Sequence, residues 1–386
     1  MPVRTAVGVS ESFDAVEAFS EAAAEAKRGL DAECDLCVAF AAAPHLGHAK
    51  WILSSIHEEL DPAHLIGCGA GGVLGGGREM ESGAGAVVWA ASLPGATLTT
   101  HHLTTERDGE EIAIDGLPPA DQLGEALLVL ADPHTFASEA LLELLADVRP
   151  GLPALGGLAS AAAAGSASLF RDGDVLDAGA VVCSVSGARI VPCVSQGATP
   201  VGPEMTITAA DGNVIRELAS KPAIERLREA IAGLDEHEQA LASEGLMLGV
   251  VIDENRPSYE RGDFLVRPVI GADPEAGAVA IGEQVRVGQT VRLQVRDGAS
   301  ADADLRESLR LGNRALGDAG PAGALLFTCN GRGSHMFEIP DHDAGAVEDA
   351  LGAATGGFFC AGEIGPVGGR NFLHGFTATL ALFGAD

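Results

Sequence analysis

Residues 324–333 read ALLFTCNGRG, an apolar stretch that runs into a short polar loop. A helical pattern covers residues 343–352, and the Gly-rich segment GFFCAGEIGPVGG follows at residues 357–369. A second apolar stretch, FLHGFTATLALF, occupies residues 372–383. The order strand, polar loop, helix, Gly-rich segment and strand is typical of an α/β protein.

The same order of elements occurs twice more, earlier in the chain. The first copy consists of CDLCVAFAAAPH (34–45), a helix at 49–60, LIGCGAGGVLGGG (65–77) and GAGAVVWAAS (83–92). The second consists of ALLVLADPHTF (126–136), a helix at 136–148, LPALGGLASAA (152–162) and GAVVCSVSG (179–187). We therefore expect internal repeats whose Gly-rich segments form loops at equivalent places, each after a helix and before a strand.

Further helices are predicted by apolar residues at helical spacing, in residues 14–29, 222–232 and 302–316. The strand TVRLQVRD (290–297) alternates apolar and polar residues, which indicates one buried face. Most other strands are continuous apolar runs, as expected for strands that are covered on both faces. The sequence thus predicts an α/β (α+β) fold with mixed β-sheets and packed helices.

A chain of 386 residues is too long for one ordinary core, so two domains are expected. The turn-rich segment SQGATPVGPE (195–204) precedes the predicted boundary. The expected domains are residues 1–212 and residues 213–386.

The net charge of −31 excludes several classes of partner. A surface this acidic repels nucleic-acid phosphates and anionic membrane faces, so neither is expected as a partner. The N-terminal MPVRTAVGVS lacks the apolar centre of a signal peptide, and no apolar run is long enough to span a bilayer. With an odd number of cysteines, 7, we expect a cytoplasmic protein with reduced thiols.

Motifs for cofactors and metals are incomplete. Residues 67–72, GCGAGG, fit the dinucleotide pattern, but the following VLGGGREMESGAG is a poor helix. Cys34 and Cys37 form C-x-x-C without a second pair to complete a zinc site. Neither a cofactor nor a metal is therefore expected.

The segments CNGRGSHMF (329–337) and FFCAGEIGPVGGRNFLH (358–374) both place arginine among glycines. Arg332 and Arg370 are candidates for a guanidinium fork that holds a ligand carboxylate. Glu363 is a candidate partner for an ammonium group, and Asn371 and His374 would orient polar atoms. Asn330 and Cys360 are also expected to be ligand-binding residues of this pocket. Glycine neighbours let backbone N–H groups approach such a ligand.

Structural roles for the same residues stay open. Glu363 and Arg370 can form an internal salt bridge, and Asn330 and Asn371 can close turns. His374 shares strand parity with two phenylalanines, which also fits a core position.

An enzyme is an alternative to a binding protein. Cys360 with His374 and Glu363 would provide a nucleophile and a base, and an inert buried thiol is the competing interpretation. Arg267 and Asp297 are secondary candidates for ligand binding, because each is placed at the end of a predicted strand.

The C-terminal stretch, from CNGRG through His342-Asp343 to GFFCAGEIGPVGGRNFLHGFTATLALF, resembles the C-terminal signature of the FIST family. DLCVAFAA, LIGCGAGGVLGGGREME, ADPHTF, LGGLAS, LFRDGDVLDAGAV and SQGATPVGPEMTIT resemble its N-terminal segments, in the same order. The resemblance covers the chain from about residue 31 to its end.

This resemblance implies an α/β protein with FIST N and FIST C domains that acts as an intracellular sensor of a small polar ligand, with amino acids as the proposed ligands. It implies no catalytic residues. Because no kinase, chemoreceptor, cyclase or F-box segment is appended, a separate signalling protein is expected as partner. A scaffold or interaction module, in which the Gly-rich segments are purely structural and which can form a homo-oligomer, is the third hypothesis.

Overall fold

The computed structural model describes residues 2–109, 111–161 and 168–386. Helices make up 26% and strands 42% of the structure, so the predicted α/β class is confirmed. The chain folds into two compact units. Unit 1 comprises Met1–Val194 together with Leu305–Asp386, and unit 2 comprises Ser195–Asp304. These units differ from a linear division at residue 212, because the C-terminal strands pair with strands from the first half of the chain.

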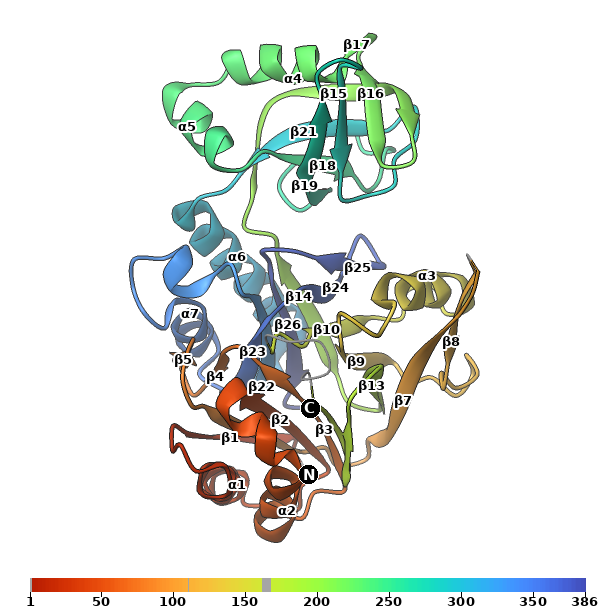
Figure 1. Cartoon of the computed structure of the whole chain (residues 1–386). Coiled ribbons are helices and arrows are strands. Elements are labelled where there is room, and N and C mark those ends of the chain that lie inside the picture. Colours follow the sequence, from red (N-terminus) through yellow and green to blue (C-terminus); the bar gives the residue numbers. More distant parts are fainter. Residues whose placement is uncertain (1, 110, 162–167) are drawn as a thin grey trace. The chain divides into compact units, whose positions relative to one another are not determined.

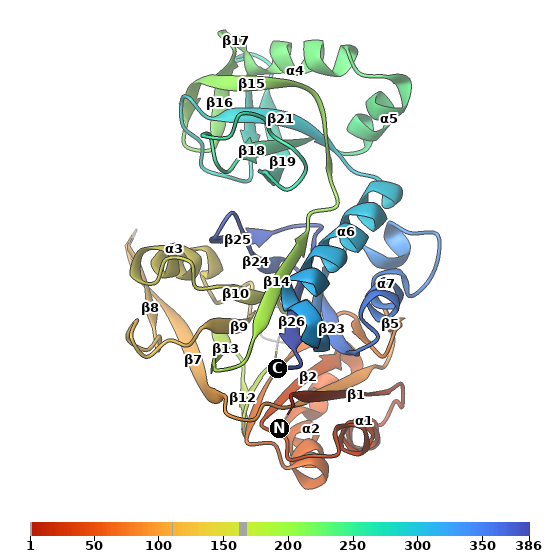
Figure 2. The ribbon, with the colours of Figure 1, turned by 180° about the vertical axis from the view of Figure 1, so that it is seen from behind.

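Unit 1 contains three modules with the same order of elements (Figures 1 and 2). Module 1 consists of β2 (Leu36–Ala42), η1 (Ala43–His48), α2 (Ala49–Leu60), β3 (His64–Ala70), β4 (Val73–Gly75), β5 (Arg78–Met80) and β6 (Ala86–Ser92). Module 2 consists of β9 (Ala126–Ala131), α3 (Ser138–Val148), β10 (Ala154–Leu158), β11 (Leu169–Arg171), β12 (Asp174–Leu176) and β13 (Ala180–Ser186). Module 3 consists of β22 (Pro321–Cys329), η3 (Gly333–His335), α7 (His342–Leu351), β23 (Ala354–Cys360), β24 (Glu363–Val367), β25 (Arg370–His374) and β26 (Ala378–Gly384).

The predicted repeat is confirmed in the strand pairing of these modules. In each, the strand after the helix pairs in parallel with the strand before it, and the last strand pairs antiparallel on the other side. The hairpin between the second parallel strand and the last strand of each module pairs with a strand of another module. Hairpin β4–β5 extends the sheet of module 3, β24–β25 extends that of module 2, and β11–β12 extends that of module 1. The exchange is cyclic and ties all three modules together.

The Gly-rich segments are largely strands, which corrects their predicted assignment as loops. Each module pairs a glycine of its second parallel strand with a residue of the first, and an added Cβ would overlap that residue's carbonyl oxygen. The pairs are Gly67 with Ala39, Gly156 with Val129, and Gly357 with Leu326. Glycine is therefore required by close strand packing at these positions rather than by a turn.

Alternate residues of the central strands face two different cores. In β22, Leu325 and Phe327 belong to the core shared by the three modules, whereas Ala324 and Leu326 pack in a second core that includes helix α7. Strands β2 and β9 divide their residues in the same way. This two-sided burial explains the continuous apolar runs of these strands.

Further elements extend each sheet of unit 1. Strands β1, β7 and β14 pair with the last strand of modules 1, 2 and 3, and β8 pairs with β7. Helix α1 packs on β1, β6 and α2. The bounds are β1 (Arg4–Ser10), α1 (Ala15–Leu30), β7 (Thr97–Asp108), β8 (Glu111–Asp115), β14 (Ile190–Ser195), α6 (Gly298–Leu316) and η2 (Gly317–Ala319). Of α6, residues 305–316 belong to unit 1 and the residues before them to unit 2.

Unit 2 is built around an antiparallel sheet that closes on itself, because β15 pairs with both β21 and β16. Its elements are β15 (Thr199–Asp211), β16 (Val214–Leu218), β17 (Lys221–Pro222), α4 (Ala223–Ala232), α5 (Glu236–Glu244), β18 (Met247–Val251), β19 (Phe264–Asp273), β20 (Ala278–Ile281) and β21 (Thr290–Val295). Val291, Leu293 and Val295 of β21 face the core, as their alternation predicts, but Gln294 is buried as well.

Helix α5 is not among the helices that the sequence pattern predicts. It begins at a capping box in which Asp235 accepts from the Glu238 backbone and Glu238 accepts from the Asp235 backbone. Within the described residues, no helix has the length and apolar character needed to cross a membrane.

Candidate functional site

The two arginine-bearing segments begin at the ends of neighbouring parallel strands. β22 ends at Cys329 and β23 ends at Cys360, and these residues are register partners. The backbone N–H of Asn330 donates to the Cys360 carbonyl at 2.9 Å, while the Asn330 side chain is exposed. Segments 329–335 and 360–363 therefore lie side by side, at the strand ends where α/β sheets commonly bind ligands.

Arg332 is fully buried and paired with Asp343, at the start of α7. Its Nε donates to Oδ2 at 2.6 Å, and its Nη2 donates to Oδ1 at 2.8 Å. Thr328 Oγ1 donates to the same carboxylate at 2.6 Å, and His342 Nδ1 lies 2.9 Å from Oδ1. Arg332, one of the two arginines of the predicted fork, is thus already paired with an internal carboxylate, which the sequence does not predict.

Both members of this pair are charged. Burial alone would raise the pKa of Asp343, but the Arg332 charge and the hydrogen bonds outweigh it and hold that pKa well below its ordinary value. Burial alone would lower the pKa of Arg332, but Asp343 outweighs it and raises that pKa. The pair therefore stays ionised throughout the physiological range.

Aromatic stacking fixes the plane of the guanidinium group. The rings of Phe337 and His342 stack with centroids 3.4 Å apart and planes 8° apart. The Arg332 guanidinium carbon lies 5.2 Å from the Phe337 ring centroid, within the range of a cation–π contact. Asp343 and Phe337 therefore both fix the position of the Arg332 guanidinium.

One edge of this guanidinium remains available. Because the group is planar, pairing through Nε and Nη2 directs Nη1 away from Asp343. Nη1 is buried and has no hydrogen-bond partner among the described residues. An unpartnered buried donor is costly, and such atoms often mark functional positions.

Glu363, the first residue of β24, presents a second unpartnered atom. Its Oε2 accepts from the Thr377 backbone N–H at 3.1 Å and from Thr377 Oγ1 at 2.9 Å. Its Oε1 is buried without a partner in the part of the chain that the structure describes. Burial raises the pKa of Glu363 to about 8, because the hydrogen bonds from Thr377 and Cys329 and the Arg332 charge offset burial only in part. The carboxyl is therefore mostly protonated at neutral pH.

A third buried atom without a hydrogen-bond partner belongs to Glu79 of β5, in module 1. Glu79 reaches module 3 because hairpin β4–β5 pairs with β23. Its backbone N–H donates to Asp341 Oδ1 at 2.6 Å, and its Oε1 accepts from the Ala344 N–H at 2.9 Å. Its Oε2 is buried and unpartnered within the described ranges. Burial, together with the nearby Asp343 charge, raises the pKa of Glu79 to about 7.

The neighbouring Glu81 also contacts module 3. It accepts from the Ser334 backbone N–H at 2.9 Å and from Ser334 Oγ at 2.6 Å, which caps the short helix η3. Sequence reasoning missed Glu79 and Glu81, although both lie in the segment LIGCGAGGVLGGGREME that resembles the family. The long separation along the chain hides their proximity to Arg332.

A strained aromatic residue lies beside these groups. Phe376 has φ +63°, a left-handed conformation that bulky residues rarely adopt. Its ring packs on Gly331, where an added Cβ would lie 2.5 Å from the ring. Gly331 precedes Arg332, and Phe376 precedes Thr377, the partner of Glu363. Backbone strain of this kind clusters at ligand sites and switch regions.

Cys360 has the environment of a core thiol rather than of a nucleophile. It is fully buried in the shared core, and burial raises its pKa well above the ordinary value. A reactive cysteine requires the opposite shift. All seven cysteines are free and buried, and the described residues contain no group of three or more His, Cys, Asp or Glu side chains suited to hold a metal.

His374 and Asn371 support the hairpin β24–β25. His374 is 4% exposed, and its Nε2 donates to the Gly365 carbonyl at 3.0 Å. The Asn371 amide donates to Leu152 O at 2.8 Å and accepts from the Ala154 N–H at 2.9 Å. Asn371 therefore fixes the hairpin to the start of β10.

Arg370 lies at the opposite end of this hairpin from Glu363. It is exposed, pairs in register with Val367, and its guanidinium carbon lies 5.7 Å from the Phe372 ring. Glu363 is paired with His374 at the other end, four residues or about 13 Å along the strand. This register rules out the direct Glu363–Arg370 salt bridge that the sequence left open.

Arg267 and Asp297 belong to unit 2, where each has partners. Arg267 pairs with Glu283, with its Nη2 3.1 Å from Oε2. Asp297 accepts from the Ser300 backbone N–H at 2.6 Å and from Ser300 Oγ at 3.1 Å, at the start of α6. The structure therefore groups Arg332, Glu363, Cys360, Asn330 and His374 in one region of unit 1, and describes Arg267 and Asp297 within a separate unit.

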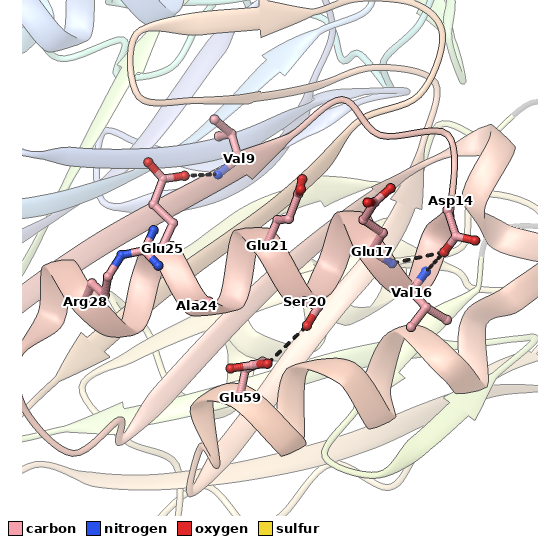
Figure 3. A pocket seen from close by; sticks show the side chains of 10 residues that line it. All are labelled: Val9, Asp14, Val16, Glu17, Ser20, Glu21, Ala24, Glu25, Arg28 and Glu59. Atoms are coloured by element: carbon pink, nitrogen blue, oxygen red, sulfur yellow. Dashed lines mark hydrogen bonds between the residues drawn. The ribbon is translucent and has the colours of Figure 1, made fainter.

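Surface grooves offer weaker sites. Figure 3 shows a groove of about 1040 Å³ along α1, lined by exposed carboxylates. Asp14 accepts from the backbone of Val16 and Glu17, and Glu25 accepts from the Val9 N–H. These contacts serve as a helix cap and as a link from α1 to β1, which accounts for two of the acidic side chains without a ligand.

Family models match most of the chain. A model described as the FIST N domain matches residues 35–221, and one described as the FIST C domain matches residues 223–366. FIST domains are associated with ligand binding in sensory signal transduction. The chain is also 44% identical over 384 residues to uncharacterized protein Rv0628c of Mycobacterium tuberculosis, covering 99% of this chain and all of that protein. Uncharacterized protein Mb0898c of Mycobacterium bovis is 44% identical over 388 residues, covering both chains completely. With both family domains matched in order, the chain belongs to the FIST family.

Proposed function

We propose that the protein is a cytoplasmic sensor that binds a free amino acid at the buried cluster of Arg332 and Glu363. The observation that carries this proposal is the pair of buried, unpartnered atoms, Arg332 Nη1 and Glu363 Oε1. They belong to side chains that interact electrostatically and come from adjacent strand ends.

An amino acid satisfies both atoms. The ligand carboxylate accepts hydrogen bonds from Nη1, and the ligand ammonium donates to Oε1. Approach of the ammonium favours the ionised form of Glu363, whose raised pKa then falls. Binding at neutral pH is therefore coupled to release of a proton from Glu363.

Ligand entry requires local opening, since Arg332 and Glu363 are both fully buried. The segment Gly375–Phe376 is the part of the cluster that opens in this proposal. Phe376 is 40% exposed and holds a strained backbone, so its displacement releases strain while it uncovers Gly331. Movement of this segment also reaches Glu363 through Thr377, which gives the bound state a structural signal for a partner protein.

Thermal-shift screening against the standard amino acids tests the proposal. At least one amino acid should raise the melting temperature of the wild type, because ligands that bind only the native state stabilise it. Glu363→Gln keeps the shape of the side chain but cannot ionise, so it should reduce that shift strongly.

Arg370→Ala serves as the matched control, because Arg370 is exposed at the far end of the same hairpin. It should respond as the wild type does. Equal responses of the wild type and Glu363→Gln would remove Glu363 from the site, and a lost response in Arg370→Ala would move the site toward the hairpin turn.

A further inference from the structure

Among the described residues, the region around Arg332 contains several carboxyl groups but one guanidinium group. Asp343 neutralises Arg332, and Glu363 and Glu79 each add a carboxyl with one buried, unpartnered oxygen. Glu81 adds a further carboxylate, held by Ser334. A zwitterionic ligand that binds Arg332 and Glu363 brings one cation and leaves the Glu79 oxygen without a partner.

Glu79 is placed beside the same arginine pair. Its Oε1 is bonded to the backbone N–H of Ala344, the residue after Asp343. Its position on the Asp343 side complements that of Glu363, which interacts with Arg332 from another strand. The two unpartnered carboxyl oxygens thus belong to side chains that interact with different members of the Arg332–Asp343 pair, and they come from different modules.

We propose, as a refinement that rests on the proposed function, that the ligand is a dibasic amino acid whose side-chain cation binds Glu79 Oε2. The α-carboxylate binds Arg332 Nη1 and the α-ammonium binds Glu363 Oε1. Lysine fits this arrangement because its flexible four-carbon stem carries a compact ammonium with three donors. Glu79 is then the residue that distinguishes dibasic from neutral amino acids.

The polar contacts of Glu79 also explain how this specificity is built. The backbone N–H of Glu79 donates to Asp341, and its Oε1 is fixed by Ala344, so Oε2 is held in place before the ligand binds. Preorganisation of this kind lowers the entropy cost of binding. A neutral side chain would leave the buried oxygen unpaired, and unpaired buried polar groups are the main source of strong discrimination.

Calorimetric titration with four related probes tests the inference. L-lysine carries all three groups, L-norleucine lacks the side-chain ammonium, 6-aminohexanoate lacks the α-ammonium, and cadaverine lacks the carboxylate. Lysine should bind at least about tenfold more tightly than norleucine, since loss of a charged hydrogen bond costs one order of magnitude or more. It should also bind more tightly than 6-aminohexanoate and cadaverine.

Two isosteric variants test which carboxyl side chain binds which ammonium group of the ligand. Glu79→Gln should remove the preference for lysine over norleucine while norleucine affinity stays unchanged. Glu363→Gln should weaken lysine and norleucine alike and leave 6-aminohexanoate unaffected. Asp349→Asn, an equivalent change at an exposed position of α7, should match the wild type with every probe.

The outcomes distinguish a wrong assignment of Glu79 from a failure of amino-acid binding itself. If norleucine binds as tightly as lysine, or if Glu79→Gln weakens both equally, the role of Glu79 is wrong and amino-acid binding stands. Cadaverine binding as tightly as lysine would overturn the role given to the carboxylate. If none of the probes and none of the standard amino acids binds, the proposed function itself fails.

Discussion

Arg332 and Asp343 form a fully buried, bidentate ion pair that leaves Nη1 of the arginine directed away from the carboxylate. Thr328 and His342 also form hydrogen bonds with the Asp343 carboxylate, whereas Arg332 Nη1 has no hydrogen-bond partner among the described residues. The Arg332–Asp343 pair therefore acts as a rigid support for one donor group rather than as a closed structural bridge.

Removing one partner of this pair should destabilise unit 1 severely. Asp343→Ala leaves the Arg332 charge buried without compensation, and the expected loss in the free energy of unfolding is about 3–5 kcal/mol. Urea unfolding of the two proteins measures this difference. Glu307→Ala, which breaks the exposed pair with Arg310, should have a much smaller effect. Comparable losses in both variants would contradict the buried character of the Arg332–Asp343 pair.

Stability should fall as the pH rises from about 5 toward 8. The pKa of Glu363 is raised in the folded state to about 8, so between its unfolded and folded pKa values the native state binds the additional proton. The free energy of unfolding then decreases with increasing pH in this window. Glu363→Gln should flatten the slope, as measured by urea unfolding at several pH values. An unchanged slope would mean that Glu363 is ionised in the native protein.

The left-handed backbone of Phe376 predicts a difference between two truncations. Phe376→Gly and Phe376→Ala both lose the ring contact with Gly331, but only alanine keeps the strain at φ +63°. The glycine variant should be more stable than the alanine variant by about 1 kcal/mol. Thermal unfolding compares them. Equal stabilities would show that residue 376 is not held in the left-handed region.

The paired glycines of the parallel strands should resist substitution. Gly67→Ala and Gly357→Ala place a Cβ on a backbone carbonyl that cannot move aside, and each should cost about 1–3 kcal/mol or more. Gly345→Ala, within α7 and with nothing close to its added Cβ, should instead stabilise by about 0.5–1 kcal/mol. Tolerance of alanine at 67 or 357 would contradict the strand register.

The sequence predicts the modules well because each is local. Apolar runs, helical spacing and the repeated order of elements all lie within segments of about 60 residues, and the three modules appear as expected. The sequence predicts the Gly-rich segments wrongly as loops, because the packing that requires glycine involves a strand more than 25 residues away in the chain. Single-sequence patterns carry no information on such a contact.

The candidate site is predicted only in part, for the same reason. Arg332 and Glu363 were identified by their unusual setting among glycines, but the bond from Arg332 to Asp343 depends on the turn between β22 and α7. Glu79 was missed because it reaches the site through the exchanged hairpin. Arg370 was grouped with Arg332 on composition alone, and the hairpin register places it far from Glu363.

The most direct test is a crystal structure of the protein grown with the amino acid that gives the largest thermal shift. The ligand carboxylate should lie within hydrogen-bond distance of Arg332 Nη1 and its ammonium within hydrogen-bond distance of Glu363 Oε1. A ligand bound elsewhere, with neither of these atoms in contact with it, would contradict amino-acid binding at Arg332 and Glu363.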